Sequence, residues 1–285
     1  MGITCTATPG QKNGSVKTVS YKNKDTMNQL NPTQRFSDRV ENYIKYRPSY
    51  PEKIMALLRS ECGLTQTSLI ADIGSGTGIL SELFLKNGNT VFGIEPNDQM
   101  RAAGEKLLAK HDRFISVNGS AEATTLANQI VDFITAAQAF HWFDRENSRR
   151  EFTRILKTNG WVVLVWNDRK TDSTPFLNAY EQLLLTHSLD YEKVNHRQID
   201  HQVIRFFFGS NTFKVATFEN YQQFDFIGLK GRLLSSSYVP TAGHPKYQAM
   251  IDDLVSIFDK HQVDGKVTIE YETIMYYGQL LSEGT

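Results

Sequence analysis

The chain has 285 residues with 31 basic and 31 acidic side chains, so its formal net charge is zero. This neutral balance argues against an extended basic surface that binds nucleic-acid phosphates. The content of 40% hydrophobic residues excludes a chain that is disordered throughout. The longest strongly apolar run, Trp161–Trp166, is far shorter than the ~20 residues that a membrane helix needs. Two cysteines cannot form a disulfide scaffold. We expect a cytoplasmic protein that binds neither nucleic acid nor a membrane and is a monomer or a weak dimer.

The chain is predicted to consist of a tail and one domain. Residues 1–33 are rich in Ser, Thr, Asn, Gly and Lys and lack apolar periodicity, which predicts a flexible N-terminal tail. The domain, residues 34–285, begins with helical segments over 34–62. The second of them, Tyr50–Cys62, has core-facing apolar spacing and stops at Gly63.

Short apolar runs then alternate with amphipathic helical stretches. The predicted strands are Leu69–Ala71, Val91–Ile94, Phe114–Val117, Val131–Ala136 and Trp161–Trp166. The predicted helices follow the first, second and fourth strands; Asn97 or Asp98 caps the second of them, Asp144 caps the third, and the third ends near Gly160. Because the strands are apolar throughout, we predict a parallel sheet with helices on both faces.

The last hundred or so residues show a different pattern. Helical stretches around Phe176–Thr186 and Tyr247–His261 accompany two alternating runs, Phe213–Phe218 and Val267–Tyr277. Alternation is typical of antiparallel strands with one buried face. The predicted fold is therefore α/β, a doubly wound, mostly parallel Rossmann-like sheet with an antiparallel edge strand and a helical cap. The cap is assigned to residues 220–263, between the last two strands.

A glycine-rich segment, Asp72-Ile-Gly-Ser-Gly-Thr-Gly78, joins the first strand to the first helix. Glycines there let the backbone turn sharply and approach a ligand. Ile79 stands where the dinucleotide fingerprint has its third glycine, and no P-loop motif is present. Glu95 ends the second strand 21 residues after Gly74, where a carboxylate can accept both ribose hydroxyls of a nucleoside. The alternative interpretation of this loop is a purely structural turn.

These segments resemble a known family. Together with Glu95-Pro96, Gly119-Ser-Ala-Glu122 and Ala137-Gln-Ala-Phe-His-Trp142, the glycine loop is similar to class I S-adenosylmethionine-dependent methyltransferases. The most similar subgroup methylates small molecules and includes the trans-aconitate methyltransferases. The resemblance covers roughly residues 36–166 and is weaker beyond, where Ser235–Pro240 and Glu270–Thr273 are similar to the same subgroup.

The resemblance implies a set of cofactor-binding residues. Those expected around the methionine portion, the ribose and the adenine of S-adenosylmethionine are Asp72, Gly74, Ser75, Gly76, Glu95, Pro96, Met100, Ser120, Ala121, Glu122, Gln138 and Ala139. Many relatives carry Asp at the position of Ser120, so Glu122 is the alternative contact for the adenine amino group.

The segment before the sheet is predicted to close over the cofactor. Tyr43 and Arg47 are four residues apart and would share a helical face, although Pro48 disfavours helix at Arg47. In similar proteins this segment covers the cofactor, which implies that Arg47 pairs with the cofactor carboxylate. A solvated helix end is the other interpretation.

The acceptor is expected beyond the fourth strand. His141 is the candidate catalytic base, because histidine titrates near neutral pH; the alternative is that it only packs or orients a neighbour. Trp142, together with Tyr238 and Arg232 of the cap, would contact the acceptor, and packing beneath the cap is the alternative for the cap residues. The His, Cys and acidic residues show no metal-site spacing, so no metal is expected.

The sequence thus predicts an enzyme that transfers a methyl group from S-adenosylmethionine to a small-molecule acceptor, at a carboxylate or a hydroxyl. The alternatives are an NAD(P)-dependent oxidoreductase on a Rossmann fold and a non-catalytic S-adenosylmethionine-binding protein.

Overall fold

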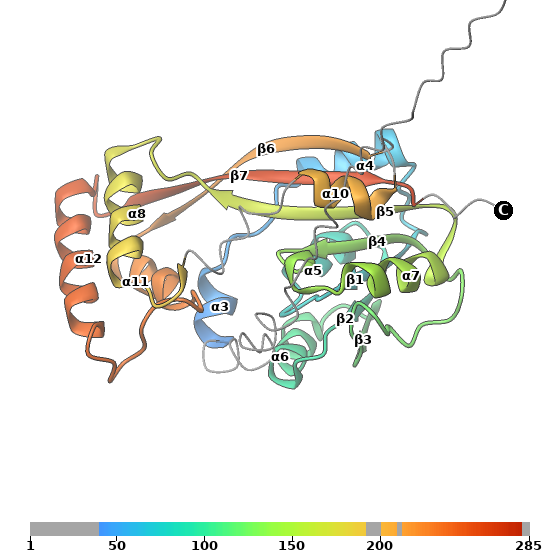
Figure 1. Ribbon diagram of the computed structural model, residues 1–285, viewed down its shortest axis with the longest axis horizontal. Coiled ribbons are helices and arrows are strands. Elements are labelled where there is room, and N and C mark those ends of the chain that lie inside the picture. Colours follow the sequence, from blue (N-terminus) through green and yellow to red (C-terminus); the bar gives the residue numbers. More distant parts are fainter. Residues whose placement is uncertain (1–39, 192–200, 210–212, 281–285) are drawn as a thin grey trace, which may run out of the picture. The chain divides into compact units, whose positions relative to one another are not determined.

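The computed structural model describes residues 40–191, 201–209 and 213–280, so the predicted tail at 1–33 lies outside the described residues. The described part is built on a seven-stranded sheet of order β3-β2-β1-β4-β5-β7-β6 (Figure 1). Its strands are β1 (Leu69–Ile73), β2 (Thr90–Ile94), β3 (Phe114–Val117), β4 (Val131–Ala137), β5 (Leu156–Arg169), β6 (Phe213–Phe224) and β7 (Val267–Gly278). The first five are parallel, whereas β7 pairs antiparallel with both β5 and β6. The predicted doubly wound fold is confirmed; β7 alone runs antiparallel to the other strands, and it lies between β5 and the edge strand β6.

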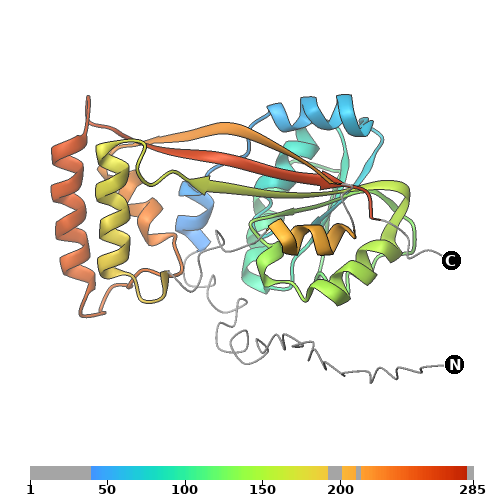
Figure 2. The same ribbon diagram turned by 45° about the horizontal axis from the view of Figure 1, so that its top comes forward.

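Helices cover both faces of this sheet (Figure 2). The described helices are α3 (Val40–Tyr46), α4 (Lys53–Cys62), α5 (Ile79–Lys86), α6 (Asp98–Leu108), the short 3-10 helix η2 (Phe140–Trp142), α7 (Arg145–Ile155), α8 (Pro175–His187), α10 (His201–Phe208), α11 (Phe226–Leu234) and α12 (Tyr247–His261). None of the helices that the structure describes is long and apolar enough to cross a membrane.

Neighbouring residues of a central strand supply two different cores. Val162 and Leu164 of β5 pack with the apolar faces of α7 and α10, whereas Val163 and Val165 pack with those of α4 and α5. Side chains of a strand alternate between the faces of the sheet, so both faces of β5 are buried. This explains why the strand is apolar throughout.

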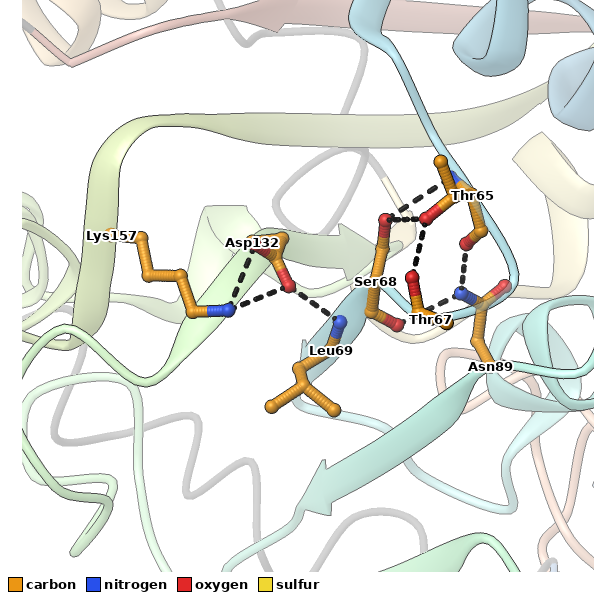
Figure 3. Close-up of polar contacts among 7 residues, drawn as sticks. All are labelled: Thr65, Thr67, Ser68, Leu69, Asn89, Asp132 and Lys157. Carbon is orange, nitrogen blue, oxygen red and sulfur yellow. Dashed lines mark hydrogen bonds and ion pairs between the residues drawn. The ribbon is translucent and has the colours of Figure 1, made fainter.

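The starts of β1, β2 and β4 are fixed by a network of polar contacts (Figure 3). The fully buried amide of Asn89 donates to the carbonyl oxygens of Thr65 and Ser68, at 2.7 and 2.8 Å. The carboxylate of Asp132 accepts from the Leu69 N–H at 2.8 Å and from the ammonium of Lys157 at 3.0 Å. These bonds fix the amino edge of the sheet, opposite the edge where ligands of such sheets bind.

Two predicted helix boundaries are wrong. The helix expected to end near Gly160 ends at Ile155, because Leu156 already pairs with Val131 of β4. The pairing of β5 with β4 then shifts register at a bulge and resumes at Trp161, which pairs with Phe133. The helix expected from Tyr50 begins at Lys53, since a residue that precedes a proline is disfavoured in the α region.

The predicted boundary of the cap is also corrected. β6 continues to Phe224, so the connection between the last two strands begins at Asp225 rather than at residue 220. The Asp225 carboxylate accepts from the Gly228 N–H at 2.7 Å and caps α11. α8, α11 and α12 gather at one end of the long strands (Figure 1) and share a separate apolar core with the end of β6 and the start of β7.

Candidate active site

A cavity lies at the carboxyl ends of β1, β2 and β4, where ligands bind in open α/β sheets. Its empty volume, part of which is open to solvent, is about 840 Å³. The residues that line it are Gly74, Gly76, Glu95, Pro96, Asn97, Met100, Ser120, Ala121, Glu122, Ala137, Gln138, Ala139, Trp142 and Phe143.

The glycine loop needs residues without a β-carbon. Gly74 and Gly76 have φ angles of +67° and +57°, in the left-handed region that favours glycine. A β-carbon at Gly74 would stand 2.7 Å from that of Ala139. The Gly74 and Ser75 N–H groups both donate to the Ile94 carbonyl oxygen, at 2.8 and 3.1 Å. The loop is therefore tied to the end of β2 and closely approached by the segment after β4.

Glu95 is held at the cavity wall by backbone donors. Its Oε2 accepts from the Gly76 N–H and its Oε1 from the Asn97 N–H, each at 2.9 Å. Burial raises the pKa of Glu95, while the two backbone N–H groups and the charge of Arg101 oppose that rise. A carboxylate oxygen can accept more than one hydrogen bond. Both oxygens therefore keep acceptor capacity for a ligand that enters the cavity.

Asp72 supports the loop from beneath. Its carboxylate accepts from the Ser81 hydroxyl of α5 at 2.6 Å and from the Thr135 hydroxyl of β4 at 2.9 Å. Complete burial raises the pKa of Asp72 to about 6, against the effect of both hydroxyl donors. This carboxyl ties β1, α5 and β4 together at the carboxyl edge of the sheet.

The opposite wall is formed by the segments after β3 and β4. Glu122 accepts from the Asp144 N–H at 2.9 Å, which orients its carboxylate. Gln138 has a φ of +53°, and its side-chain amide donates to the Asn167 carbonyl oxygen at 3.0 Å. A positive φ is uncommon for a residue with a β-carbon, and such residues concentrate at functional sites.

The structure brings together most of the predicted site residues. Of the expected cofactor and acceptor residues, eleven line the cavity: Gly74, Gly76, Glu95, Pro96, Met100, Ser120, Ala121, Glu122, Gln138, Ala139 and Trp142. Asp72 and Ser75 line a smaller adjoining hollow with Tyr50. Three further lining residues, Asn97, Ala137 and Phe143, were not among the predicted site residues. Ala137 belongs to a quoted motif, and Asn97 and Phe143 each directly follow one, so adjacency in the sequence was the available signal.

Other predicted residues are not among the lining residues in the part of the chain that the structure describes. Arg47 follows the end of α3, and its guanidinium Nη2 donates to the Ser235 carbonyl oxygen at 2.9 Å. Tyr43 belongs to α3, but its side chain lies outside the described part of the structure. The His141 ring lies 4.9 Å from that of Trp142, centroid to centroid, without lining the cavity.

The two remaining predicted acceptor residues lie in the cap. The Arg232 guanidinium is buried and donates from Nε to the Tyr271 hydroxyl at 3.1 Å. The Tyr238 ring packs against that of Tyr191, with 4.8 Å between ring centroids. Neither residue contributes to the wall of the cavity described above.

Comparisons with known proteins agree with this geometry. A family model described as a methyltransferase domain matches residues 71–164. An uncharacterized methyltransferase of Schizosaccharomyces pombe is 26% identical over 249 residues, covering 85% of this chain and 95% of the relative. A methyltransferase-like protein of the same organism is 31% identical over 52% of this chain and 57% of its own length. An uncharacterized methyltransferase of Mycobacterium bovis is 31% identical over 47% of this chain and 52% of its length. The matched regions of the latter two span about half of each relative.

Solved structures show the same fold. A provisionally assigned type II methyltransferase from Anaeromyxobacter dehalogenans superposes with a TM-score of 0.63 at 18% identity, covering 83% of this chain and 99% of that one. The YcgJ protein from Bacillus subtilis superposes with a TM-score of 0.53 at 18% identity, covering 82% and 100%. The domain match and the curated relatives indicate an S-adenosylmethionine-dependent methyltransferase, and the solved structures show that the fold is shared. The methyltransferase domain implies binding of S-adenosylmethionine.

Proposed function

We propose that the chain binds S-adenosylmethionine in the cavity at the ends of β1, β2 and β4 and transfers its methyl group to a small-molecule acceptor. The observation that carries the proposal is the Glu95 carboxylate, held at the wall by the Gly76 and Asn97 N–H groups. A carboxylate at this strand end suits a ribose diol, and the glycine loop beside it lets a ligand approach the backbone.

The remaining wall residues are assigned by their place around Glu95. Pro96 and Met100 would flank the adenine, with Glu122 accepting from its amino group. Gln138 and Ala139, after β4, would contact the methionine portion. The close fit between Ala139 and Gly74 leaves the loop backbone as the surface on which that portion lies.

The acceptor would enter beside the aromatic wall of Trp142 and Phe143. The bound cofactor supplies a sulfonium methyl that is already electrophilic, so the protein's main task is to hold the acceptor in line, and this can supply ~7–11 kcal/mol of a barrier. Because His141 packs against Trp142 rather than forming the wall, we assign it a positioning role instead of that of a base. We assign the acceptor group to a carboxylate or a hydroxyl.

The finer assignment to the small-molecule subgroup that includes the trans-aconitate methyltransferases is part of the same proposal. It is supported by the Ser235–Pro240 and Glu270–Thr273 segments, which belong to the cap and to β7. Arg47 lies at the first of these segments through its bond to Ser235. We keep Arg47 as the candidate partner of the cofactor carboxylate, because a guanidinium can donate more than one hydrogen bond.

Calorimetric titration of the full chain with S-adenosylmethionine, and separately with NAD, tests the proposal. We expect saturable binding of S-adenosylmethionine and none of NAD; the reverse result would support an oxidoreductase and overturn the proposal. Incubation with methyl-labelled cofactor and a panel of carboxylic acids and alcohols, followed by mass spectrometry, then tests transfer. Binding without transfer to any acceptor would favour the non-catalytic alternative.

A further inference from the structure

Asn167 is a buried asparagine near the end of β5, and its side chain contacts three other segments of the chain. Only 4% of its surface is exposed. Its Oδ1 accepts from the Thr273 hydroxyl of β7 at 2.5 Å and from the Asn220 amide of β6 at 3.2 Å. Its Nδ2 donates to the Ser49 carbonyl oxygen at 3.2 Å. The side chain thus connects three neighbouring strands to the connection between α3 and α4, which Figure 1 shows in blue.

The carbonyl oxygen of Asn167 fixes a wall residue of the cavity. The pairing of β4 with β5 ends at Ala137 and Val165, so β5 continues past its neighbour. Gln138 donates from its N–H to the Val165 carbonyl oxygen at 2.9 Å and from its side-chain amide to the Asn167 carbonyl oxygen at 3.0 Å. These two bonds hold Gln138 at its positive φ of 53°. Because Gln138 lines the cavity, Asn167 supports this part of the wall.

The side-chain amide of Asn167 fixes the backbone next to Tyr50. Residues 48–51 belong to neither a helix nor a strand, so their backbone groups need partners from elsewhere in the chain or from water. The Ser49 carbonyl oxygen accepts from Nδ2 of Asn167 at 3.2 Å and from Nδ2 of Asn220 at 2.8 Å. Since a peptide group is planar, bonds to this oxygen also fix the plane that contains the Tyr50 nitrogen.

The start of the same connection is anchored independently. The carbonyl oxygen of Tyr46, the last residue of α3, accepts from the Gln222 side-chain amide at 3.2 Å. The Tyr46 ring packs against Gly231 of α11, where a β-carbon would stand 2.0 Å from the ring. Loss of the Asn167 amide would therefore loosen the backbone at Ser49 without releasing α3 from α11.

The two segments that Asn167 holds border the same part of the site. Tyr50 lines the smaller hollow, and Gln138 lines the cavity. Gly74 of the glycine loop belongs to the walls of both. The proposed function places the methionine portion of the cofactor at this junction, whereas the ribose lies at Glu95. Asn167 should therefore affect binding of the methionine portion and leave binding of the nucleoside unchanged.

We propose that Asn167 is a positioning residue for the methionine portion of S-adenosylmethionine. Its carbonyl oxygen orients Gln138, and its side-chain amide holds the peptide group that precedes Tyr50. In the part of the chain that the structure describes, Asn167 is not among the residues that line the cavity or the hollow, so it acts on the ligand through those two residues. The inference rests on the proposed function, because it requires the cofactor to bind in this cavity.

Isothermal titration of the full chain with S-adenosylhomocysteine and with 5′-methylthioadenosine tests this role. The second ligand shares the adenine, the ribose and the sulfur with the first but lacks its amino-acid portion. Asn167→Ala removes the hydrogen bonds of the side chain, so it should raise the Kd for S-adenosylhomocysteine roughly tenfold and leave that for 5′-methylthioadenosine within about twofold. Asn220→Ala removes the other donor to Ser49 and should act in the same direction by a smaller factor. Asn178→Ala is the matched control, because Asn178 is an exposed asparagine of α8. It should bind both ligands as the wild type does.

Equal weakening of both ligands by Asn167→Ala would show a general loss of structure and overturn the positioning role, and so would unchanged binding of S-adenosylhomocysteine. If Asn167→Ala does not unfold cooperatively, the same comparison of ligands in Asn220→Ala decides. Wild-type binding of S-adenosylhomocysteine no tighter than that of 5′-methylthioadenosine would overturn the positioning role alone, because the amino-acid portion would then not be held. A wild-type chain that binds neither ligand would overturn the proposed function, and the role of Asn167 with it.

Discussion

Replacing Glu95 with alanine probes the contact on which the cofactor assignment depends. The substitution removes a carboxylate placed for the ribose diol and also the acceptor of the Gly76 and Asn97 N–H groups. A hydrogen bond to a charged group contributes about 1.5–3 kcal/mol, and 1.4 kcal/mol corresponds to a factor of ten. Loss of one such bond to the ribose should therefore weaken S-adenosylmethionine binding by roughly 10- to 150-fold. The loss of loop order should add to this effect.

Isothermal titration with S-adenosylmethionine and S-adenosylhomocysteine measures the change. Glu105→Gln is the control, because Glu105 is an exposed carboxylate of α6 that accepts from the Ser116 hydroxyl and lies outside the cavity wall. Its dissociation constant should match that of the wild type. A dissociation constant for Glu95→Ala within twofold of the wild-type value, in a variant with an unchanged Tm, would show that the ribose lies elsewhere.

Three further substitutions test the support of the site. Gly74→Ala should lower stability by about 1–3 kcal/mol in urea unfolding and weaken cofactor binding in calorimetry, because its φ is positive and its β-carbon would meet that of Ala139. In Asp72→Asn the stability relative to wild type should increase as the pH rises from about 4 to 7. Burial raises the pKa of Asp72 to about 6, so the protonated carboxyl stabilises the folded wild type at low pH, and this stabilisation is lost as the pH rises through that value. Urea unfolding at several pH values measures the difference in free energy of unfolding between the variant and the wild type. Gly231→Ala would place a β-carbon 2.0 Å from the Tyr46 ring, so it should displace α3 from α11 and lower the Tm by several degrees in thermal unfolding. Unchanged stability in any of these variants would contradict the corresponding contact.

The sequence was most informative where local chemistry determines the structure. The uniformly apolar strands predicted the parallel sheet, and the glycine loop with Glu95 predicted the cavity that both line. Asn97 and Asp144 cap their helices as expected, through bonds to the N–H groups of the first turn. The helix caps depend on residues that are close together in the chain. The cavity depends on the carboxyl ends of parallel strands, which all lie at the same edge of the sheet.

The arrangement of the cap could not be predicted in the same way. Arg47 and Ser235 are 188 residues apart in the sequence, and only folding brings the Arg47 guanidinium to the Ser235 carbonyl oxygen at the end of α11. The alternating pattern of Phe213–Phe218 did not show that β6 continues to Phe224, because Asn220–Gln223 are polar on both faces. Their pairing partner, β7, supplies the hydrogen bonds that extend the strand.

The lengths of the last strands have a mechanical consequence. β5 has 14 residues and β6 and β7 have 12 each, whereas β1 and β2 have five. The ladder between β6 and β7 continues without a break from Phe213 to Phe224, from the half of the sheet that carries the glycine loop into the cap core. Swinging the cap as a rigid body would require a continuous ribbon of paired backbone to bend, so the cap has no hinge at its base.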